Sequence, residues 1–370
     1  MIDISKILKR AWYILWNYRI LWIFGLLLAI TAGGGIGSNP QVSYQTNRQD
    51  WQNMRSPTPL PQFLEEMNQW IQVNVNPLFA TETQAIHTAI WIVVGLLIFF
   101  MIVGTLVALV RYPTETAVIR MVDEYEQTGT KVGFKQGWKM GWSRAAFRLW
   151  VIDFIVSLPA FLFVLVLLGV GVTLYYSIQS GAQALAVAGT VAAIGCLFVF
   201  ILVFAVGMVF LTLLKQFFWR AAVLEDTGVR DSFRRGWEIF KGNWKSGILI
   251  WLVMIGLAIA FGIASVLLII VLIPVMLVTL LAGLIVAGIP GALFGGLVSL
   301  FAPTWVAVLV GALIFLPIFF TVGFSPYTLV SGWVKIFESN VWTLTYREMK
   351  VLGSLQADKE LPPLVPEQTA

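Results

Sequence analysis

Long apolar runs alternate with short polar and basic segments along this chain. The longest uncharged stretch extends from Ser246 to Val334. Because roughly 20 consecutive apolar residues cross the hydrocarbon core of a bilayer, each run of that length predicts a membrane-spanning helix. We predict an all-α polytopic transmembrane bundle with six spans, over residues 18–33, 88–110, 146–174, 187–213, 246–275 and 304–330.

The segment 276–303 is also apolar, but helix-breaking residues interrupt it. It contains two prolines and five glycines, namely Gly283, Gly288, Pro290, Gly291, Gly295, Gly296 and Pro303. Irregular backbone at membrane depth is tolerated only where protein or water covers it. We therefore expect a re-entrant or interfacial hairpin on the outer side of the membrane. Two short full spans, which would give eight crossings, are the alternative.

The positions of Lys and Arg assign the two sides of the membrane. Segments 111–145 and 213–245 contain six and seven Lys/Arg residues, and the N-terminus is also basic. Cytoplasmic loops carry such an excess of positive charge. We predict a bacterial plasma-membrane protein with both termini in the cytoplasm. The polar segment 33–87 is then an extracytoplasmic loop, and the proline-containing tail 351–370 is predicted to be disordered.

Two stretches of the chain match each other. Residues 128–138 read TGTKVGFKQGW and residues 227–237 read TGVRDSFRRGW, at an offset of 99. A fainter copy, LKRAW, ends at Trp12. We interpret 88–175 and 187–275 as repeat units within one integral membrane domain over 1–350. The last span and the N-terminal segment would form a third unit, giving a pseudo-threefold bundle in which the N-terminal and C-terminal helices touch.

Each copy is a short amphipathic helix that carries basic residues and tryptophan and leads into an apolar run. Such helices lie in the membrane interface, where Trp occupies the headgroup level and Lys and Arg meet phosphates. They act either as simple anchors or as a cytoplasmic ring that binds an anionic lipid or a protein partner. The candidate contacts are Lys9, Arg10, Trp12, Lys135, Trp138, Arg234, Arg235, Trp237, Lys241 and Trp244.

Composition excludes several classes of site. Of 370 residues, 59% are hydrophobic and 12% are charged, and the net charge of +5 follows the membrane topology and not a nucleic-acid footprint. The single cysteine, Cys196, and the single histidine, His87, exclude an intramolecular disulfide and paired Cys or His metal ligands. Phosphate-binding loops and nucleophile motifs are also missing. We predict no cofactor, no metal and no catalytic residue.

Asp153 is the one acid inside an apolar run, which makes it a candidate for function. It lies close to Arg148, however, at the cytoplasmic end of its span. We expect a structural ion pair with Arg148 or with a cation of a neighbouring unit. The acids before the two Thr-Gly turns, among them Glu225 and Asp226, are interpreted as solvated groups that face the next basic helix.

The stretches LEDTGVRDSFRRGWEIFKGNW and ILKRAWYILWNYRILWIFGLLL resemble a broad group of uncharacterised bacterial multi-pass proteins. That group is similar to the membrane domain fused to glycerophosphoryl diester phosphodiesterases, where a basic segment with Gly-Trp, then Phe and Asn-Trp, precedes an apolar helix. Here these positions are Gly236-Trp237, Phe240 and Asn243-Trp244. The catalytic barrel of the fused proteins, with its acidic metal ligands, has no counterpart in this chain, so the resemblance implies a membrane domain without that activity.

The sequence thus predicts a non-enzymatic membrane scaffold or lipid-associating domain whose partners are membrane lipids, anionic lipids among them. It predicts no nucleic-acid partner, and it does not identify a protein partner. Two alternatives stay open: a transporter of a small solute or lipid, and an intramembrane lipid-modifying enzyme.

Overall fold

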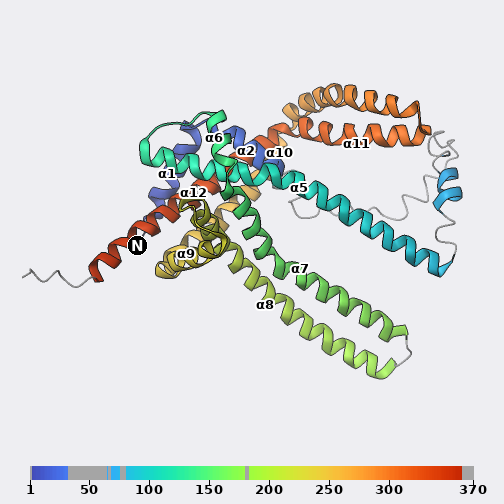
Figure 1. The fold of residues 1–370 in the computed structure, drawn as a ribbon, viewed down its shortest axis with the longest axis horizontal. Coiled ribbons are helices and arrows are strands. Elements are labelled where there is room, and N and C mark those ends of the chain that lie inside the picture. Colours follow the sequence, from blue (N-terminus) through green and yellow to red (C-terminus); the bar gives the residue numbers. More distant parts are fainter. Residues whose placement is uncertain (1, 32–64, 66–67, 76–80, 180–182, 361–370) are drawn as a thin grey trace, which may run out of the picture. The chain divides into compact units, whose positions relative to one another are not determined.

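The computed structural model describes residues 2–31, 65, 68–75, 81–179 and 183–360, and within these ranges the chain is helical and contains no β-strand (Figure 1). The prediction of an all-α protein is confirmed. The elements are α1 (Ile4–Asn17), α2 (Leu21–Thr31), η1 (Ile71–Val75), α5 (Glu82–Thr128), α6 (Phe134–Gly141), α7 (Arg144–Gln179), α8 (Gln183–Leu224), α9 (Val229–Gly242), α10 (Trp244–Ser299), α11 (Thr304–Gly323) and α12 (Ser325–Glu360).

Several of these helices have the length and composition of membrane spans. Among the described residues, five segments qualify: Val93–Thr128, Arg144–Thr173, Leu197–Leu224, Trp244–Val298 and Thr304–Gly323. The pair α1 and α2, bent by 102°, makes a sixth if it counts as one broken span. At 1.5 Å per residue, the 20 residues of α11 reach about 30 Å, the thickness of the hydrocarbon core. The chain is therefore a polytopic helical membrane protein.

The described helices group into two compact units. Unit 1 comprises Met1–Phe24, Arg111–Phe261 and Val334–Ala370, and unit 2 comprises Gly25–Val110 and Gly262–Trp333. Each unit is assembled from stretches that are far apart in the sequence. The division therefore does not follow simple boundaries along the chain.

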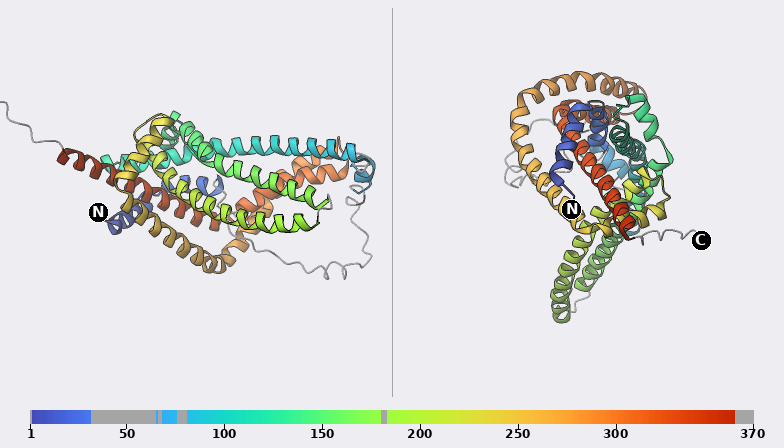
Figure 2. Two further views of the ribbon diagram at one scale, coloured as in Figure 1. Left: turned by 90° about the horizontal axis from the view of Figure 1, so that it is seen from below. Right: turned by 90° about the vertical axis from the view of Figure 1, so that its left-hand side faces the viewer.

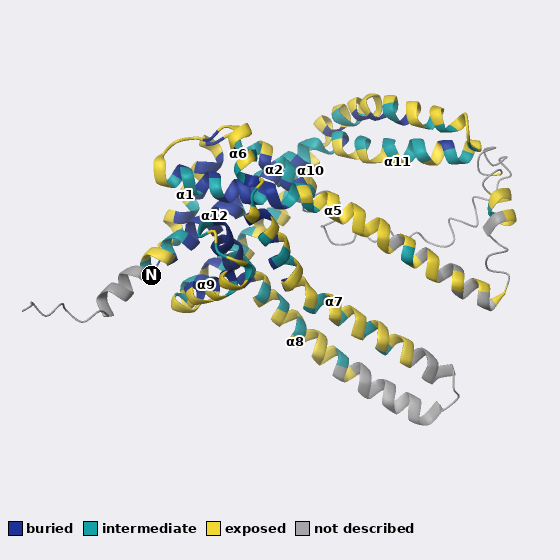
Figure 3. Cartoon of the chain, in the orientation of Figure 1, coloured by how far each residue is buried: buried dark blue, intermediate teal, exposed yellow. Residues whose placement is uncertain are grey.

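Helix α12 is the central element of unit 1. Phe337 contacts Trp12 of α1 and Phe261 of α10, with ring centroids 6.1 and 6.4 Å apart. Trp342 contacts Phe217 of α8 at 5.9 Å. Figure 3 shows the buried residues concentrated around α12. The contact between N-terminal and C-terminal helices that a pseudo-threefold bundle requires is therefore present.

Helices α7 and α8 leave this core as a pair. Phe163 of α7 stacks on Phe204 of α8 with centroids 4.1 Å apart, and the two helices lie side by side in both Figure 1 and Figure 2. Their remaining faces expose large apolar side chains such as Phe161 and Phe198. Exposed apolar surface of this extent is unfavourable in water and favourable in lipid. The pair is thus built for the hydrocarbon layer.

The two matching stretches share a helix–turn–helix arrangement in unit 1 but differ in detail. A long helix, α5 or α8, leads through the Thr-Gly segment into a short helix, α6 or α9, but α8 ends three residues before Thr227 and α9 begins directly after Gly228, whereas α5 reaches Thr128 and α6 begins only at Phe134. Gly129 has φ +71°, a conformation that favours glycine, so this turn needs the residue that the sequence provides. Gly137 and Gly236 then face the preceding helix so closely that a Cβ on Gly236 would lie 2.7 Å from Phe218 Cδ1. Small residues therefore fix the approach of both short helices.

Helix α10 corrects the expectation for 276–303. The helix continues through this segment to Ser299, and the turn lies at 300–303, after which α11 returns alongside α10 in unit 2 (Figure 1). A Cβ on Gly291 or Gly295 would lie 3.0 Å from Phe315 Cβ or Ala307 O. Gly283, Gly291 and Gly295 form a close-packing face on a helix that continues to Ser299, so the prediction of a hairpin within 276–303 is wrong.

Candidate functional site

The basic tryptophan helices α1, α6 and α9 each have one buried and one exposed face. The buried faces contain small residues: Ala11 on α1, Gly137 on α6 and Gly236 on α9. Trp12 of α1, whose ring also contacts Phe337, is 50% exposed, and Trp237 of α9 is 44% exposed. Lys9, Lys135, Arg234, Lys241 and Trp244 are exposed as well. These side chains are available to lipid headgroups or to a partner.

Three of the predicted contacts instead hold the fold together. Arg10 Nε donates to Glu126 Oε1 at 2.8 Å, and Arg235 Nε donates to Glu225 Oε2 at 3.0 Å. Trp138 is half-buried and packs on the rings of Phe24 and Phe134. The candidate residues thus divide into a structural group and an outward-facing group.

Glu225 is the centre of a charged cluster at the end of α8. Its side chain is 13% exposed and also accepts a 2.8 Å hydrogen bond from the Tyr346 hydroxyl, with Lys350 Nζ at 3.3 Å. Burial raises the pKa of Glu225, but the hydrogen bond from Tyr346 and the charges of Lys350 and Arg235 outweigh it, so the pKa is lowered. Glu225 faces the next basic helix as predicted, but it is mostly buried and not solvated.

Asp153 has two partners from neighbouring helices. Tyr112 of α5 donates its hydroxyl to Oδ2 at 2.6 Å, and Lys215 of α8 donates to Oδ1 at 2.9 Å. Arg148 donates instead to Asp226 Oδ1 at 2.7 Å. Two ion pairs were expected for Asp153, one with Arg148 and one with a cation of a neighbouring repeat unit. The pair observed is the second, because Lys215 belongs to the repeat unit 187–275. This arrangement links α5, α7 and α8 and indicates a structural role.

A buried polar layer, which the sequence reasoning missed, lies between α5, α8 and α12. Arg220 of α8 is 1% exposed, with Nη2 3.8 Å from Glu115 Oε1 of α5 and 3.4 Å from the carbonyl oxygen of Ser339 of α12. Ser339 Oγ donates to the same Glu115 oxygen at 3.0 Å, and Gln216 accepts from Arg220 Nη1. A buried Arg needs such partners.

Helices α5 and α12 run parallel and in register through this layer. The contacts Ser339–Glu115 and Arg347–Asp123 both join residues 224 positions apart. The same register brings Thr116 to the level of Asn340. Both residues are fully buried, and neither the Thr116 hydroxyl nor the Asn340 amide has a hydrogen-bond partner among the described residues. Buried groups of this kind are usually satisfied by ordered water, so the layer is a polar core within an apolar bundle.

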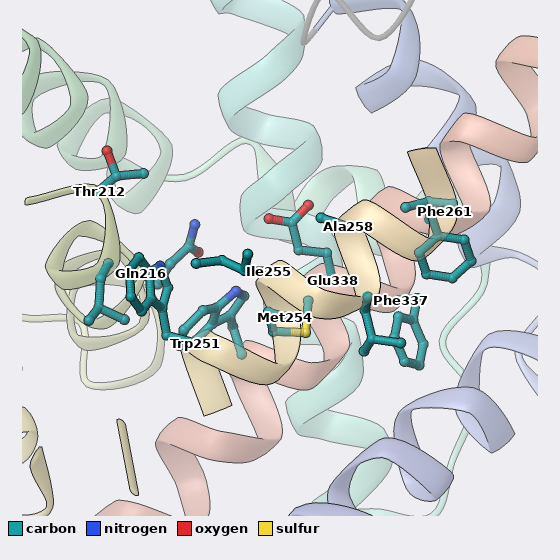
Figure 4. A pocket seen from close by; sticks show the side chains of 13 residues that line it. Thr212, Gln216, Trp251, Met254, Ile255, Ala258, Phe261, Phe337 and Glu338 are labelled. Atoms are coloured by element: carbon teal, nitrogen blue, oxygen red, sulfur yellow. The ribbon is translucent and has the colours of Figure 1, made fainter. Parts of the chain in front are cut away.

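A partly open cavity of about 200 Å³ adjoins this layer between α8, α10 and α12 (Figure 4). Its apolar wall includes two Trp, two Phe and one Met, namely Trp251, Met254, Phe261, Phe337 and Trp342. Its polar wall includes Thr212, Gln216 and Glu338. Because Arg220 engages the amide oxygen of Gln216, the amide NH₂ is the group that Gln216 can offer to a ligand.

Glu338 brings a carboxylate to this cavity from α12. Lys335 Nζ lies 3.3 Å from its Oε2, and both side chains are substantially exposed. No group of three or more His, Cys, Asp or Glu residues suited to a metal ion occurs in the part of the chain that the structure describes. The cavity therefore offers recognition through aromatic rings, one amide donor and one carboxylate.

Comparison with known proteins gives a family but no function. Residues 3–358 match the model of a family described only as a family of unknown function, DUF7544. No curated protein and no solved structure matches the chain.

Proposed function

We propose a function from the geometry of the chain itself, because the family to which the chain belongs, DUF7544, is described only as a family of unknown function. The proposed function is a non-enzymatic membrane scaffold that holds anionic lipid headgroups with the basic tryptophan helices α1, α6 and α9. The bacterial plasma membrane and cytoplasmic termini remain part of this proposal, as does the resemblance to the membrane domain fused to phosphodiesterases.

The observation that carries the proposal is the two-faced construction of these helices. Their small residues face the rest of unit 1, while Trp12 of α1, Trp237 of α9 and Trp244, the first residue of α10, are about half exposed. An exposed tryptophan is stable at the boundary of headgroups and acyl chains, because its ring is apolar and its N–H is polar. The construction therefore suits helices that lie in an interface.

The cations on the outer faces supply the preference for anionic lipid. The side chain of Arg234 is 78% exposed and pairs only with the half-exposed Glu238 on its own helix, at 3.5 Å, and Lys9, Lys135 and Lys241 are exposed as well. Each Lys or Arg near an anionic membrane surface contributes about 1 kcal/mol. Arg10 and Arg235 contribute less to lipid binding, because their charges are paired with Glu126 and Glu225.

The test is native mass spectrometry of the full chain released from nanodiscs that contain equal amounts of phosphatidylglycerol and phosphatidylethanolamine. We expect the wild type to retain phosphatidylglycerol and the Arg234→Glu/Lys241→Glu variant to lose most of it. The matched control is Arg48→Glu/Arg55→Glu, which makes the same change in charge. Both residues lie in the loop 33–87, which the sequence predicts to be on the opposite side of the membrane from the basic helices. Equal phosphatidylglycerol retention in all three proteins would refute the proposal.

A further inference from the structure

We propose that the cavity between α8, α10 and α12 is a second lipid site, one that binds the zwitterionic headgroup of an aminophospholipid. The ammonium group would lie at Glu338, the phosphate at Lys335, which pairs with Glu338 beside the cavity, and the first part of the lipid chains along the apolar wall at Met254 and Ile255. This site goes beyond the proposed function, because it uses different residues and selects a different class of lipid.

Charge complementarity supports this ligand. Glu338 and Lys335 form an i,i+3 pair at 3.3 Å, with side chains 36% and 42% exposed. An exposed pair of this kind contributes little to stability, so a ligand can open it without a large loss. A headgroup that carries both an ammonium and a phosphate restores a partner to each of the two residues. A lipid with only a phosphate would leave its negative charge beside the Glu338 carboxylate.

The aromatic wall supports an ammonium in particular. Trp251 of α10 and Trp342 and Phe337 of α12 all line the cavity with Glu338. A cation held against aromatic faces gains about 0.5–2 kcal/mol, and aromatic cages are a recurring way to bind organic ammonium groups. Figure 4 labels Glu338 of α12 and Trp251, Met254 and Ala258 of α10 among the side chains that line this cavity.

The size of the cavity fits a headgroup and not a whole lipid. Its volume of about 200 Å³ is somewhat larger than the roughly 150 Å³ of an apolar cavity that holds benzene. The acyl chains would therefore extend outward along α10, where Leu252 and Ile259 are 59% and 60% exposed. Those side chains belong to the segment Trp244–Val298, which is apolar enough to cross a membrane.

The position along the helices agrees with the headgroup level. On α8, Gln216 lies next to Lys215, near the polar end of the span Leu197–Leu224. On α10, Trp251 follows Lys245 by less than two turns. The end of the cavity lined by Gln216 and Trp251 thus lies where charged residues meet the apolar run on both helices, while Glu338 and Lys335 of α12 bring charge to the part of the site beside Ala258 and Phe261. Arg220 does not compete for the ligand phosphate, because Glu115 and Gln216 hold its guanidinium inside unit 1.

The experiment compares retained lipids in the same nanodiscs with equal phosphatidylethanolamine and phosphatidylglycerol. Glu338→Gln removes the carboxylate, and because a hydrogen bond to a charged group is lost, we expect retained phosphatidylethanolamine to fall about tenfold. Glu348→Gln, the same change elsewhere on α12, should retain it. Ala258→Trp fills the cavity without changing a charge and should also lose phosphatidylethanolamine.

The outcomes separate this site from the basic helices. Arg234→Glu/Lys241→Glu should lose phosphatidylglycerol and keep phosphatidylethanolamine, whereas Glu338→Gln should do the reverse. Wild-type retention of phosphatidylethanolamine in both Glu338→Gln and Ala258→Trp would overturn the second site alone. Equal loss of both lipids in Glu338→Gln would also overturn it, because the carboxylate would then not select the headgroup.

Discussion

Replacing Arg220 by Met tests whether the buried polar layer holds unit 1 together. Arg220 Nη2 lies 3.8 Å from Glu115 Oε1, and Coulomb attraction at that distance is about 4 kcal/mol for an effective dielectric constant near 20. Desolvation of both charges offsets much of this attraction in the intact pair. Removing one partner leaves the other charge buried and unpaired, however, which costs about 3–5 kcal/mol. We expect Arg220→Met to lower the free energy of unfolding by that amount.

The double variant Arg220→Met/Glu115→Gln provides the critical comparison. It removes both charges, so its loss of stability should be smaller than that of Arg220→Met, below about 2 kcal/mol, as for other buried pairs replaced together. The free energy of unfolding is measured by titration with sodium dodecyl sulfate in mixed micelles, followed by far-ultraviolet circular dichroism. If Arg220→Met unfolds within about 0.5 kcal/mol of the wild type, the range of ordinary surface changes, the reasoning is refuted.

Three further predictions use the same titration. Gly236→Ala should destabilise unit 1 by about 1–3 kcal/mol through overpacking against α8, whereas Gly242→Ala, with no heavy atom within 4 Å of the new Cβ, should be neutral; equal effects would contradict this. Asp153→Asn should cost about 1–3 kcal/mol by leaving Lys215 without its acid, and adding Lys215→Met should recover part of that, with full additivity as the contrary result. Folding lowers the pKa of Glu225 from its ordinary value of 4.5, so the ionised carboxylate contributes its full stabilisation of the folded state above pH 4.5 and loses it as the pH falls further. Glu225→Gln should make the free energy of unfolding depend less on pH in this acid range. A pH dependence equal to that of the wild type would count against the cluster.

The membrane class and most helices could be predicted from the sequence because each depends on local composition. An uncharged run of more than 80 residues, from Ser246 to Val334, can hardly be anything other than membrane helix. The tryptophan and basic residues of α9 likewise predict an interfacial helix without knowledge of its neighbours. What failed was the interpretation of glycine. In a single sequence, Gly291 and Gly295 indicate equally a broken helix or a close helix contact, and only the position of α11 decides between them.

The polar layer and the cavity could not be predicted because they depend on which helices meet. Arg220 is one of seven cations in the segment 213–245, and nothing in its immediate neighbourhood marks it as the buried one. Its partners Glu115 and Ser339 lie 105 residues before it and 119 residues after it. Likewise, Arg235 and Arg234 are equivalent in the sequence, but only the structure shows that Arg235 is paired with Glu225. Pairing across such separations is a property of the assembled unit.

The central place of α12 has a consequence for how the protein is made. The ribosome synthesises Ser339 224 residues after Glu115, which at roughly 5–20 residues per second takes about 11–45 s. During the last 119 residues of that interval, after Arg220 has been synthesised, α5 and α8 both exist, while the helix that satisfies their buried polar groups does not. Nascent chains must therefore wait in an incompletely paired state, and this is the period in which insertion factors or proteases would distinguish a productive chain from a failed one.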